Sequence, residues 1–273
     1  MSVNFRSAFK KKSMPNDAFE ETRNFWNRVA DDWWMQVGHE GDSNRRLNSD
    51  PVLWQFAGDV KGLSVLDAGC GTGYLSKKLH DQGAQVTGID FSERMIEIAR
   101  TRYPDLDFRV DSCSRLDTIP DRHCNMVIAN YVLMDTPDLS GTMHAFSRVL
   151  KTGGVAILIF SHPCFPQGRA THSWTGKSPC YCWKGSYFEP RKNISPPWAH
   201  FTSEFIWFHR PLSDYWKAFK SAGFMLMDFE EPRIAAANYH LEQDQRKLER
   251  SKTRPYSVAF KLQKQHDPQT IPL

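Results

Sequence analysis

Several features common in membrane and secreted proteins are missing from this sequence of 273 residues. It has no apolar run long enough to cross a bilayer, and its mean hydropathy is negative. The basic N-terminal stretch MSVNFRSAFKKKS is not followed by an apolar segment, so it does not resemble a secretion signal. The six cysteines lack regular paired spacing, which argues against a disulfide framework. We therefore expect a reduced, cytoplasmic location and no membrane partner.

A strong excess of one charge is also missing. The net charge is +4, from 35 basic and 31 acidic residues. The basic stretches FKKK (9–12) and QRKLERSKTR (245–254) are short, and the second also contains an acid. Nucleic-acid-binding proteins usually carry a larger and more clustered basic excess. We therefore do not expect a nucleic acid as the partner.

Tryptophan is absent from residues 55–172, although the chain has nine tryptophans in all. The rings lie in the two flanks, and large rings dominate packing wherever they occur. This distribution predicts a generic core under an aromatic cap built from both flanks. Some of the rings are candidate substrate contacts, although each could equally fill a contact between cap and core: Trp26, Trp33, Trp34 and Trp174.

Residues 63–160 alternate between short apolar runs and helical patterns. Strands are predicted over 63–66, 84–89, 107–110, 125–129 and 155–160. Helices are predicted from Leu75, from a cap at Ser92, and over 142–150 before Thr152-Gly153-Gly154. One or two helices are predicted over 19–37. Strands alternating with helices favour an α/β doubly wound sheet.

The pattern stops after residue 160 and resumes later. Residues 161–203 are rich in Pro, Gly, Trp and Cys and show no clear period, which predicts a functional insertion. Beyond it, strands are predicted over 205–208, 224–229 and 256–262, with a helix from a cap at Ser213 to Ala222.

The stretch VLDAGCGTGYLSKKLH (65–80) has a glycine loop that fits neither common phosphate-binding pattern. After Gly69 and Gly71, the third small residue of G-x-G-x-x-G is replaced by Tyr74, and no Gly-Lys-Ser/Thr follows. Asp67 would repel a pyrophosphate. A carboxylate there favours a cofactor with positive charge near the loop, such as S-adenosylmethionine, which has an ammonium and a sulfonium but no phosphate.

Two further acids follow the next strands. Asp90 ends the second strand, where a carboxylate accepts hydrogen bonds from ribose hydroxyls in doubly wound folds. Asp111 lies just past the third strand, where it could approach an adenine amino group. Three acids at successive strand ends therefore predict one binding site along this edge of the sheet.

Two segments, LDAGCGTG and GIDFSERMIEIA, resemble the first two motifs of the class I S-adenosylmethionine-dependent methyltransferases, in the small-molecule group. DFRVDSCS, NMVIANYVLMDTPD and FSRVLKTGGVAIL resemble the segments that follow in that family. The resemblance implies a mostly parallel, seven-stranded, Rossmann-like sheet. It divides the chain into an N-terminal helical cap (1–60), a cofactor-binding core (61–160), a substrate-side insertion (161–204), the completion of the sheet (205–264) and a tail (265–273).

The resemblance also implies roles for single residues. The loop with Gly69, Gly71 and Gly73 would wrap the methionine part of the cofactor, and Asp90 would hold the ribose. Met95 would pack on the adenine or in the core. The remaining cofactor contacts would be Asp67, Cys70 as a small filler, Phe91, Asp111 and Ser112 at the adenine edge, and Asn130 near the transferred methyl group.

The acceptor side is less defined. A hydroxyl or protonated amine acceptor needs a general base, for which we predict His162, Tyr131 or His209. Arg210 is a candidate substrate contact, or could pair with an acid such as Glu231. The Cys and His residues of the insertion do not have zinc-site spacing, so no metal is expected.

The predicted function is therefore methyl transfer to a nitrogen, oxygen, sulfur or carbon atom of a small molecule, with S-adenosylhomocysteine as product. Two alternatives remain: an RNA-directed methyltransferase, and a cofactor-binding protein without catalysis. The sequence leaves the oligomeric state open between monomer and homodimer.

Overall fold

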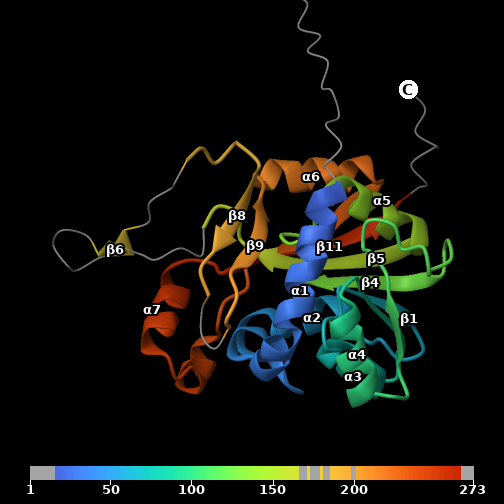
Figure 1. The fold of residues 1–273 in the computed structure, drawn as a ribbon, viewed down its shortest axis with the longest axis horizontal. Helices are drawn as coiled ribbons and strands as arrows, with labels where there is room; N and C mark the ends of the chain where they lie inside the picture. The colour runs from blue at the N-terminus through green and yellow to red at the C-terminus, as the bar shows by residue number, and fades with distance from the viewer. Residues whose placement is uncertain (1–15, 166–170, 173–178, 181–184, 198–200, 266–273) are drawn as a thin grey trace, which may run out of the picture.

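The computed structural model describes residues 16–165, 171–172, 179–180, 185–197 and 201–265 (Figure 1). Its centre is a seven-stranded sheet, in the order β10 (Phe224–Glu230), β11 (Ser257–Lys264), β5 (Leu150–Ser161), β4 (Cys124–Asn130), β1 (Ser64–Ala68), β2 (Gln85–Asp90) and β3 (Asp107–Val110). Strands β1 to β5 pair in parallel, whereas β11 is antiparallel to both β5 and β10. The predicted doubly wound, mostly parallel seven-stranded sheet is confirmed.

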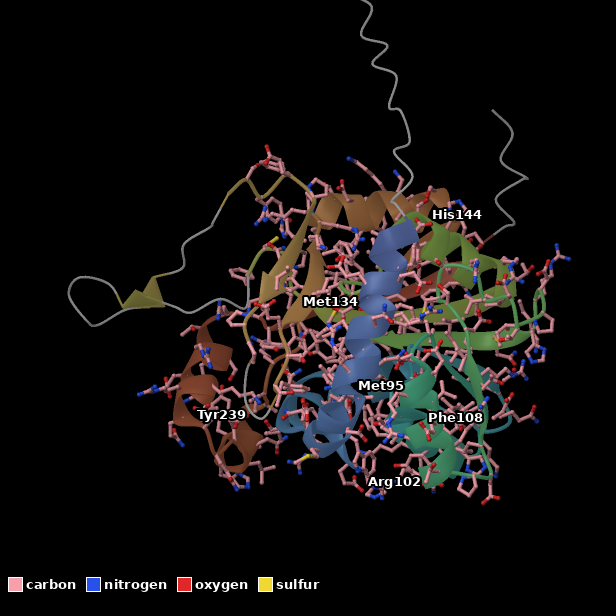
Figure 2. The ribbon with its side chains drawn as sticks, viewed as in Figure 1. Met95, Arg102, Phe108, Met134, His144 and Tyr239 are labelled. Carbon is pink, nitrogen blue, oxygen red and sulfur yellow. The ribbon has the colours of Figure 1, made fainter. Side chains whose placement is uncertain are left out.

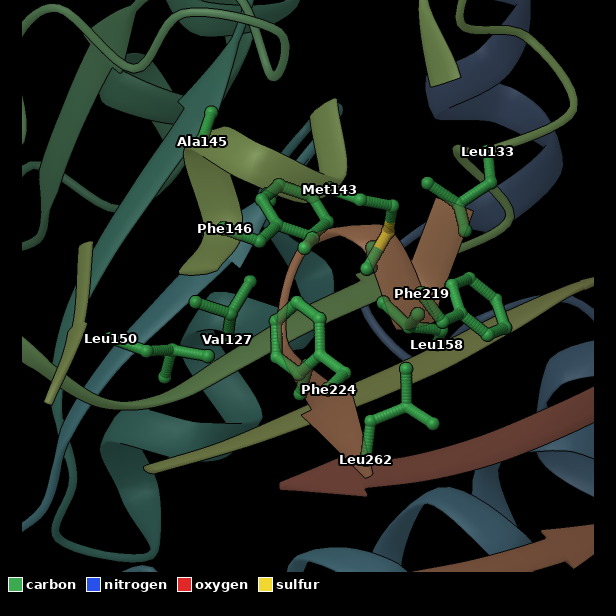
Figure 3. Close-up of a cluster of buried hydrophobic side chains, with 14 of the residues drawn as sticks. Val127, Leu133, Met143, Ala145, Phe146, Leu150, Leu158, Phe219, Phe224 and Leu262 are labelled. Atoms are coloured by element: carbon green, nitrogen blue, oxygen red, sulfur yellow. The ribbon is translucent and has the colours of Figure 1, made fainter. Parts of the chain in front are cut away.

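Helices cover both faces of the sheet, so alternate side chains of the central strands are buried on opposite sides. On one face, Val127, Leu158 and Leu262 pack under α5 (Leu139–Val149) and α6 (Leu212–Ser221), as Figure 3 shows. On the other face, Ile128 and Ile157 pack under α2 (Asp50–Ala57) and α3 (Tyr74–Asp81). Burial on both faces explains why these strands read as nearly continuous apolar runs.

A second group of elements lies outside the seven-stranded sheet. Helix α1 (Asn16–Val37), drawn in blue in Figure 1, contacts both α4 (Glu93–Arg102) and β9 (Phe205–His209). It is followed by a single π-helical turn, η1 (Arg45–Ser49), which leads into α2. The other elements are β6 (Thr171–His172), β7 (Pro179–Cys180), β8 (Arg191–Ser195), η2 (Ala236–Leu241) and α7 (Gln245–Thr253).

Several local predictions can be compared with the structure. Ser92 caps α4 as predicted, since its Oγ accepts a hydrogen bond from the Met95 N–H at 3.1 Å. The predicted cap at Ser213 is wrong, because α6 starts one residue earlier, after Pro211. The helix end at Thr152-Gly153-Gly154 is also wrong. Helix α5 stops at Val149, and these residues form the irregular start of β5, where its register with β4 shifts.

Candidate functional site

A cavity lies at the carboxyl ends of β1, β2 and β4, underneath α1. It holds about 820 Å³ of empty space, including its open mouth. Ligands of open α/β sheets bind at this edge of the sheet. Twelve lining residues were predicted from the sequence: Trp26, Trp33, Asp67, Gly69, Cys70, Gly71, Asp90, Phe91, Met95, Ser112, Asn130 and Tyr131.

The glycine loop forms the floor of the cavity. Gly69 and Gly71 have φ values of +75° and +54°, which side chains rarely adopt. The N–H groups of Gly69 and Cys70 both donate to the carbonyl of Ile89, at 2.8 Å, which ties the loop to β2. A Cβ at Gly69 would lie 2.5 Å from Cγ2 of Val132, so the loop packs too closely for any side chain there. Gly73 does not line the cavity.

Asp67 and Asp90 are two acids whose hydrogen bonds, within the described residues, involve no basic side chain. Asp67 is 2% exposed and accepts a hydrogen bond of 2.6 Å from Ser76 Oγ, and burial raises its pKa to about 7. Asp90 accepts from the N–H groups of Gly71 and Ser92 at 3.0 and 2.9 Å, and burial raises its pKa to about 6. A cation bound nearby would favour their charged forms.

Asp111, the third acid of the predicted binding site, has a different environment from Asp67 and Asp90. The Asp111 carboxylate accepts hydrogen bonds from the N–H groups of Ser112 and Asp117 and from both the N–H and the hydroxyl of Thr118. It therefore organises the turn after β3 and does not line the cavity, whereas Ser112 and Cys113 do. The predicted contact of Asp111 with a ligand stays a prediction.

Asn130 ends β4, Tyr131 follows it, and both side chains belong to a buried polar network. Asn130 Nδ2 donates to the hydroxyl of Tyr74 at 3.0 Å, and Asn44 Nδ2 donates to the hydroxyl of Tyr131 at 2.7 Å. The Tyr131 hydroxyl also bonds Ser257 Oγ. Burial raises the pKa of Tyr131, so its hydroxyl is neutral at pH 7. Its φ of +61° is unusual for a bulky residue and marks a constrained position.

Aromatic residues of α1 close the cavity on the side opposite the sheet. Trp26 and Trp33 pack edge to face, with ring centroids 5.2 Å apart, and both line the cavity with Phe19. Figure 2 labels Met95, which packs with Ala30 of this helix and with Trp26 and Trp33. Trp34 instead packs on His39 and Arg102, away from the cavity lining, and Trp174 lies outside the described residues.

The two predicted histidine bases and Arg210 do not line the cavity. His162 Nδ1 accepts from the Cys164 N–H at 3.1 Å, and its Nε2 lies 2.9 Å from Glu231 Oε1. Because Nδ1 accepts, Nε2 carries the proton and donates it to the carboxylate. His209 Nε2 lies 2.8 Å from the carbonyl of Tyr187. Both rings thus anchor backbone segments, and burial lowers the pKa of each.

Arg210 is buried against main-chain carbonyls. Its guanidinium donates to the carbonyls of Leu133, Thr136 and Pro137, at 2.5 to 3.2 Å. The alternative prediction that Arg210 pairs with Glu231 is wrong, since Glu231 bonds His162. Arg210 therefore holds the loop after β4, and that loop contributes Asp135 to the cavity.

Sequence reasoning missed part of the lining. Asp135 stands in the segment NYVLMDTPD, so its place after the fourth strand was a usable signal. Arg45 had no such sequence signal, because it lies between α1 and α2 in a segment without a motif. The missed lining residues are Phe19, Arg45, Tyr74, Leu75, Cys113, Val132, Asp135, Thr136 and Pro137.

The described residues lack both a membrane-spanning helix and a group of metal-ligating side chains. None of the helices in that part of the chain is both long and apolar enough to cross a membrane. No group of three or more His, Cys, Asp or Glu side chains in the same residues could hold a metal ion.

Comparison with known proteins agrees with the motifs. The family of methyltransferase domains matches residues 66–158. A ubiquinone biosynthesis O-methyltransferase of Photorhabdus laumondii is 29% identical over 154 residues, which are 53% of this chain and 62% of that protein. A demethylmenaquinone methyltransferase of Tropheryma whipplei is 32% identical over 150 residues, 52% of this chain and 60% of that protein. The chain thus spans about three fifths of these relatives.

A solved structure shares the fold. An S-adenosylmethionine-dependent methyltransferase from Mesorhizobium loti superposes with a TM-score of 0.64 at 21% identity, covering 78% of this chain and 96% of that one. At this level of identity, the likeness shows that the two chains have the same architecture. The identity of a ligand must come from the cavity itself.

Proposed function

We propose that this chain, which carries a class I S-adenosylmethionine-dependent methyltransferase domain at residues 66–158, transfers a methyl group to a small molecule. The observation that carries the proposal is the cavity where Asp67 and Asp90 meet the glycine loop. Two buried acids at a glycine-rich turn suit a cationic nucleoside and oppose a pyrophosphate.

The residues of the cavity fit S-adenosylmethionine. Gly69 and Gly71 let the backbone approach a ligand, and Asp90 holds a carboxylate at the strand end where ribose hydroxyls bind in such folds. When bound, the cofactor supplies a methyl group on a sulfonium, which is a good leaving group. The chain then has to align the acceptor and exclude water, and both are tasks for the aromatic side of the cavity.

The acceptor side favours a flat or cationic small molecule. Phe19, Trp26 and Trp33 offer ring faces and edges to whatever occupies the space beside the glycine loop. The relatives named for ubiquinone biosynthesis and demethylmenaquinone support a small-molecule acceptor. Asp135 is the side chain we assign as general base, because it lines the cavity and burial raises its pKa well above the usual range.

Calorimetry tests the cofactor proposal. We expect micromolar binding of S-adenosylmethionine and S-adenosylhomocysteine and no heat with NAD. Binding of NAD without binding of S-adenosylhomocysteine would refute it.

Product formation tests the acceptor class. Phenols, catechols and aromatic amines should be compared with total RNA by following S-adenosylhomocysteine release. Turnover with a phenol or amine that is insensitive to salt supports the proposal, whereas salt-sensitive labelling of RNA alone would support the RNA-directed alternative. Asp135→Asn should lower turnover while leaving cofactor binding intact.

A further inference from the structure

We propose that Arg210 is a positioning residue for the transfer reaction: it holds the loop that carries Asp135 and stabilises the negative charge of this carboxyl. The inference rests on the proposed function, in which Asp135 is the general base, and goes beyond it, because Arg210 does not line the cavity. When a hydroxyl or amine acceptor forms its bond to the methyl carbon, the bond from that carbon to sulfur breaks and leaves its electron pair on sulfur. The proton of the acceptor passes to a carboxylate oxygen of Asp135.

The guanidinium of Arg210 binds the loop after β4 through three carbonyl groups. Nη1 donates to the carbonyl of Leu133 at 3.2 Å. Nη2 donates to the carbonyls of Thr136 and Pro137, at 2.5 and 3.0 Å. The residue is 8% exposed, and its Cζ lies 5.3 Å from the ring centroid of Phe208. A planar group that donates to three carbonyls fixes the course of the backbone between them.

The backbone of Asp135 is held on both sides by such contacts. Its own N–H donates to the carbonyl of Val132 at 2.9 Å. The carbonyl of Met134, which Figure 2 labels near β9, accepts from the N–H of Phe208 at 2.7 Å. Leu133, labelled in Figure 3, is fully buried in the core. The Asp135 carboxyl is therefore kept at the wall of the cavity.

The charge of Arg210 also acts on Asp135. The three hydrogen bonds of the guanidinium go to neutral carbonyls, so they do not cancel its positive charge. Burial raises the pKa of Asp135 well above its usual range, and Arg210 is the strongest of the influences that lower it. Arg45 also lowers this pKa, whereas Asp90 raises it, and Tyr215 stays neutral because burial raises its own pKa. Arg210 therefore favours the carboxylate form, which can accept a proton.

Two substitutions separate the hydrogen bonds of Arg210 from its charge. Arg210→Met removes both, whereas Arg210→Lys keeps a positive charge but cannot bind three carbonyls in one plane. Arg210→Gln, which is neutral but can still donate to a carbonyl, replaces Arg210→Met if that variant does not fold. Arg148→Met is the matched control. The guanidinium of Arg148 also donates to three carbonyls, in the loop after β3: those of Arg115, Leu116 and Ile119.

The first measurement is a titration of the Asp135 carboxyl. Infrared spectra of each protein would be recorded over a range of pH, and the spectra of the same protein with Asp135→Asn would be subtracted. Arg210→Met should raise the midpoint by roughly 1–3 pH units, as expected when an opposite charge nearby is lost. Arg210→Lys and Arg148→Met should keep the midpoint of the wild type. A residue with only a structural role would move Arg210→Lys as far as Arg210→Met, and that result would overturn the inference.

The second measurement is turnover, with catechol as the acceptor and release of S-adenosylhomocysteine as the signal. Arg210→Lys should lower kcat by roughly 10- to 100-fold, because a small displacement of a catalytic group is costly. The KM for S-adenosylmethionine should not change, and Arg148→Met should keep the kcat of the wild type. An unchanged kcat in both Arg210→Lys and Arg210→Met would overturn the inference.

The outcomes separate the inference from the proposed function. A midpoint that Arg210→Met leaves unchanged would overturn the inference alone. Failure of the wild type to bind S-adenosylmethionine would instead refute the proposed function. If the wild type binds S-adenosylmethionine but does not turn over catechol, the midpoints alone decide whether Arg210 acts on Asp135.

Discussion

The two sides of the cavity are built in different ways. The sheet wall, which we define as Asp67, Gly69, Gly71 and Asp90, comes from the ends of β1 and β2 and from the turn after β1. The cap wall, defined as Phe19, Trp26, Trp33 and Arg45, comes from α1 and the π-helical turn. In the sheet wall, local backbone geometry fixes every position. In the cap wall, positions depend on packing between segments far apart in the chain.

This difference explains which residues the sequence predicts. A glycine loop after a strand has a recognisable spacing, because positive φ values and close packing require glycine at particular places. Arg45 lines the cavity from a segment without a motif, where Trp33, Tyr74 and Tyr131 surround it. Motif reading therefore works for the sheet wall, and the cap wall needs a three-dimensional structure.

The largest expected effect comes from breaking the sheet wall at Gly69. Gly69→Ala should abolish measurable S-adenosylhomocysteine binding, because its Cβ would clash with Val132 and push the loop out of place. Gly153→Ala is the matched control: Gly153 has nearly the same φ, +77°, but a Cβ there meets nothing within 4 Å. Calorimetry should show normal binding for the control. Equal loss in both variants would mean that backbone strain alone is responsible.

A smaller effect is expected when only a charge of the sheet wall is removed. Asp90→Ala should weaken S-adenosylhomocysteine binding by roughly 10- to 100-fold, since hydrogen bonds to a carboxylate are worth about 1.5–3 kcal/mol each. Asp107→Ala, which removes an exposed acid at the start of β3, is the control. A dissociation constant for Asp90→Ala equal to that of the control would show that Asp90 does not contact the ligand.

Lowering the pH should also weaken ligand binding, as Asp90→Ala does. Burial raises the pKa of Asp67 to about 7 and that of Asp90 to about 6, so both take up protons as the pH falls towards 5.5. If the ligand binds the charged forms, its affinity between about pH 7.5 and pH 5.5 falls by roughly 4-fold if only the charge of Asp90 is needed, roughly 25-fold if only that of Asp67 is needed, and roughly 100-fold if both are needed. Calorimetry at several pH values checks this. A flat profile would show that neither acid changes its charge on binding.

The smallest effect on binding is expected outside both walls, at His162. His162→Ala should leave the dissociation constant of S-adenosylhomocysteine within about threefold, because the ring bonds Glu231 and the backbone of Cys164 and does not line the cavity. It should instead lower the free energy of unfolding by about 1–3 kcal/mol near pH 7.5. A large loss of cofactor affinity would show that His162 does contribute to the binding site.

The pH dependence of that loss has a definite sign. Burial lowers the pKa of His162 below 6.5, so the folded state keeps the ring neutral while the unfolded chain takes up a proton. The stability supplied by the ring is therefore complete above pH 6.5 and is lost as the pH falls through the folded pKa. Denaturant unfolding should show the difference between wild type and His162→Ala shrinking in acid.

The fold was more predictable than the site, for physical reasons that particular elements illustrate. The central strands β1, β4 and β5 are buried on both faces, and helix α4 begins at the clear capping residue Ser92, so the sequence patterns of these elements are strong. The junction of α5 and β5 failed because Thr152-Gly153-Gly154 looks like a helix end, yet the strand starts at Leu150. Helix α7 was not predicted, since only Leu248 of its residues is buried.

The position of β11 has a consequence for how this chain folds during synthesis. Although β11 follows every other strand in sequence, it lies between β5 and β10 and pairs with both. Its Lys264 is 1% exposed and donates to the carbonyl of Leu150. Until that residue has left the ribosome, β5 presents an open apolar edge that other chains can join. Nascent chains stopped before residue 257 should therefore be the ones that need a chaperone.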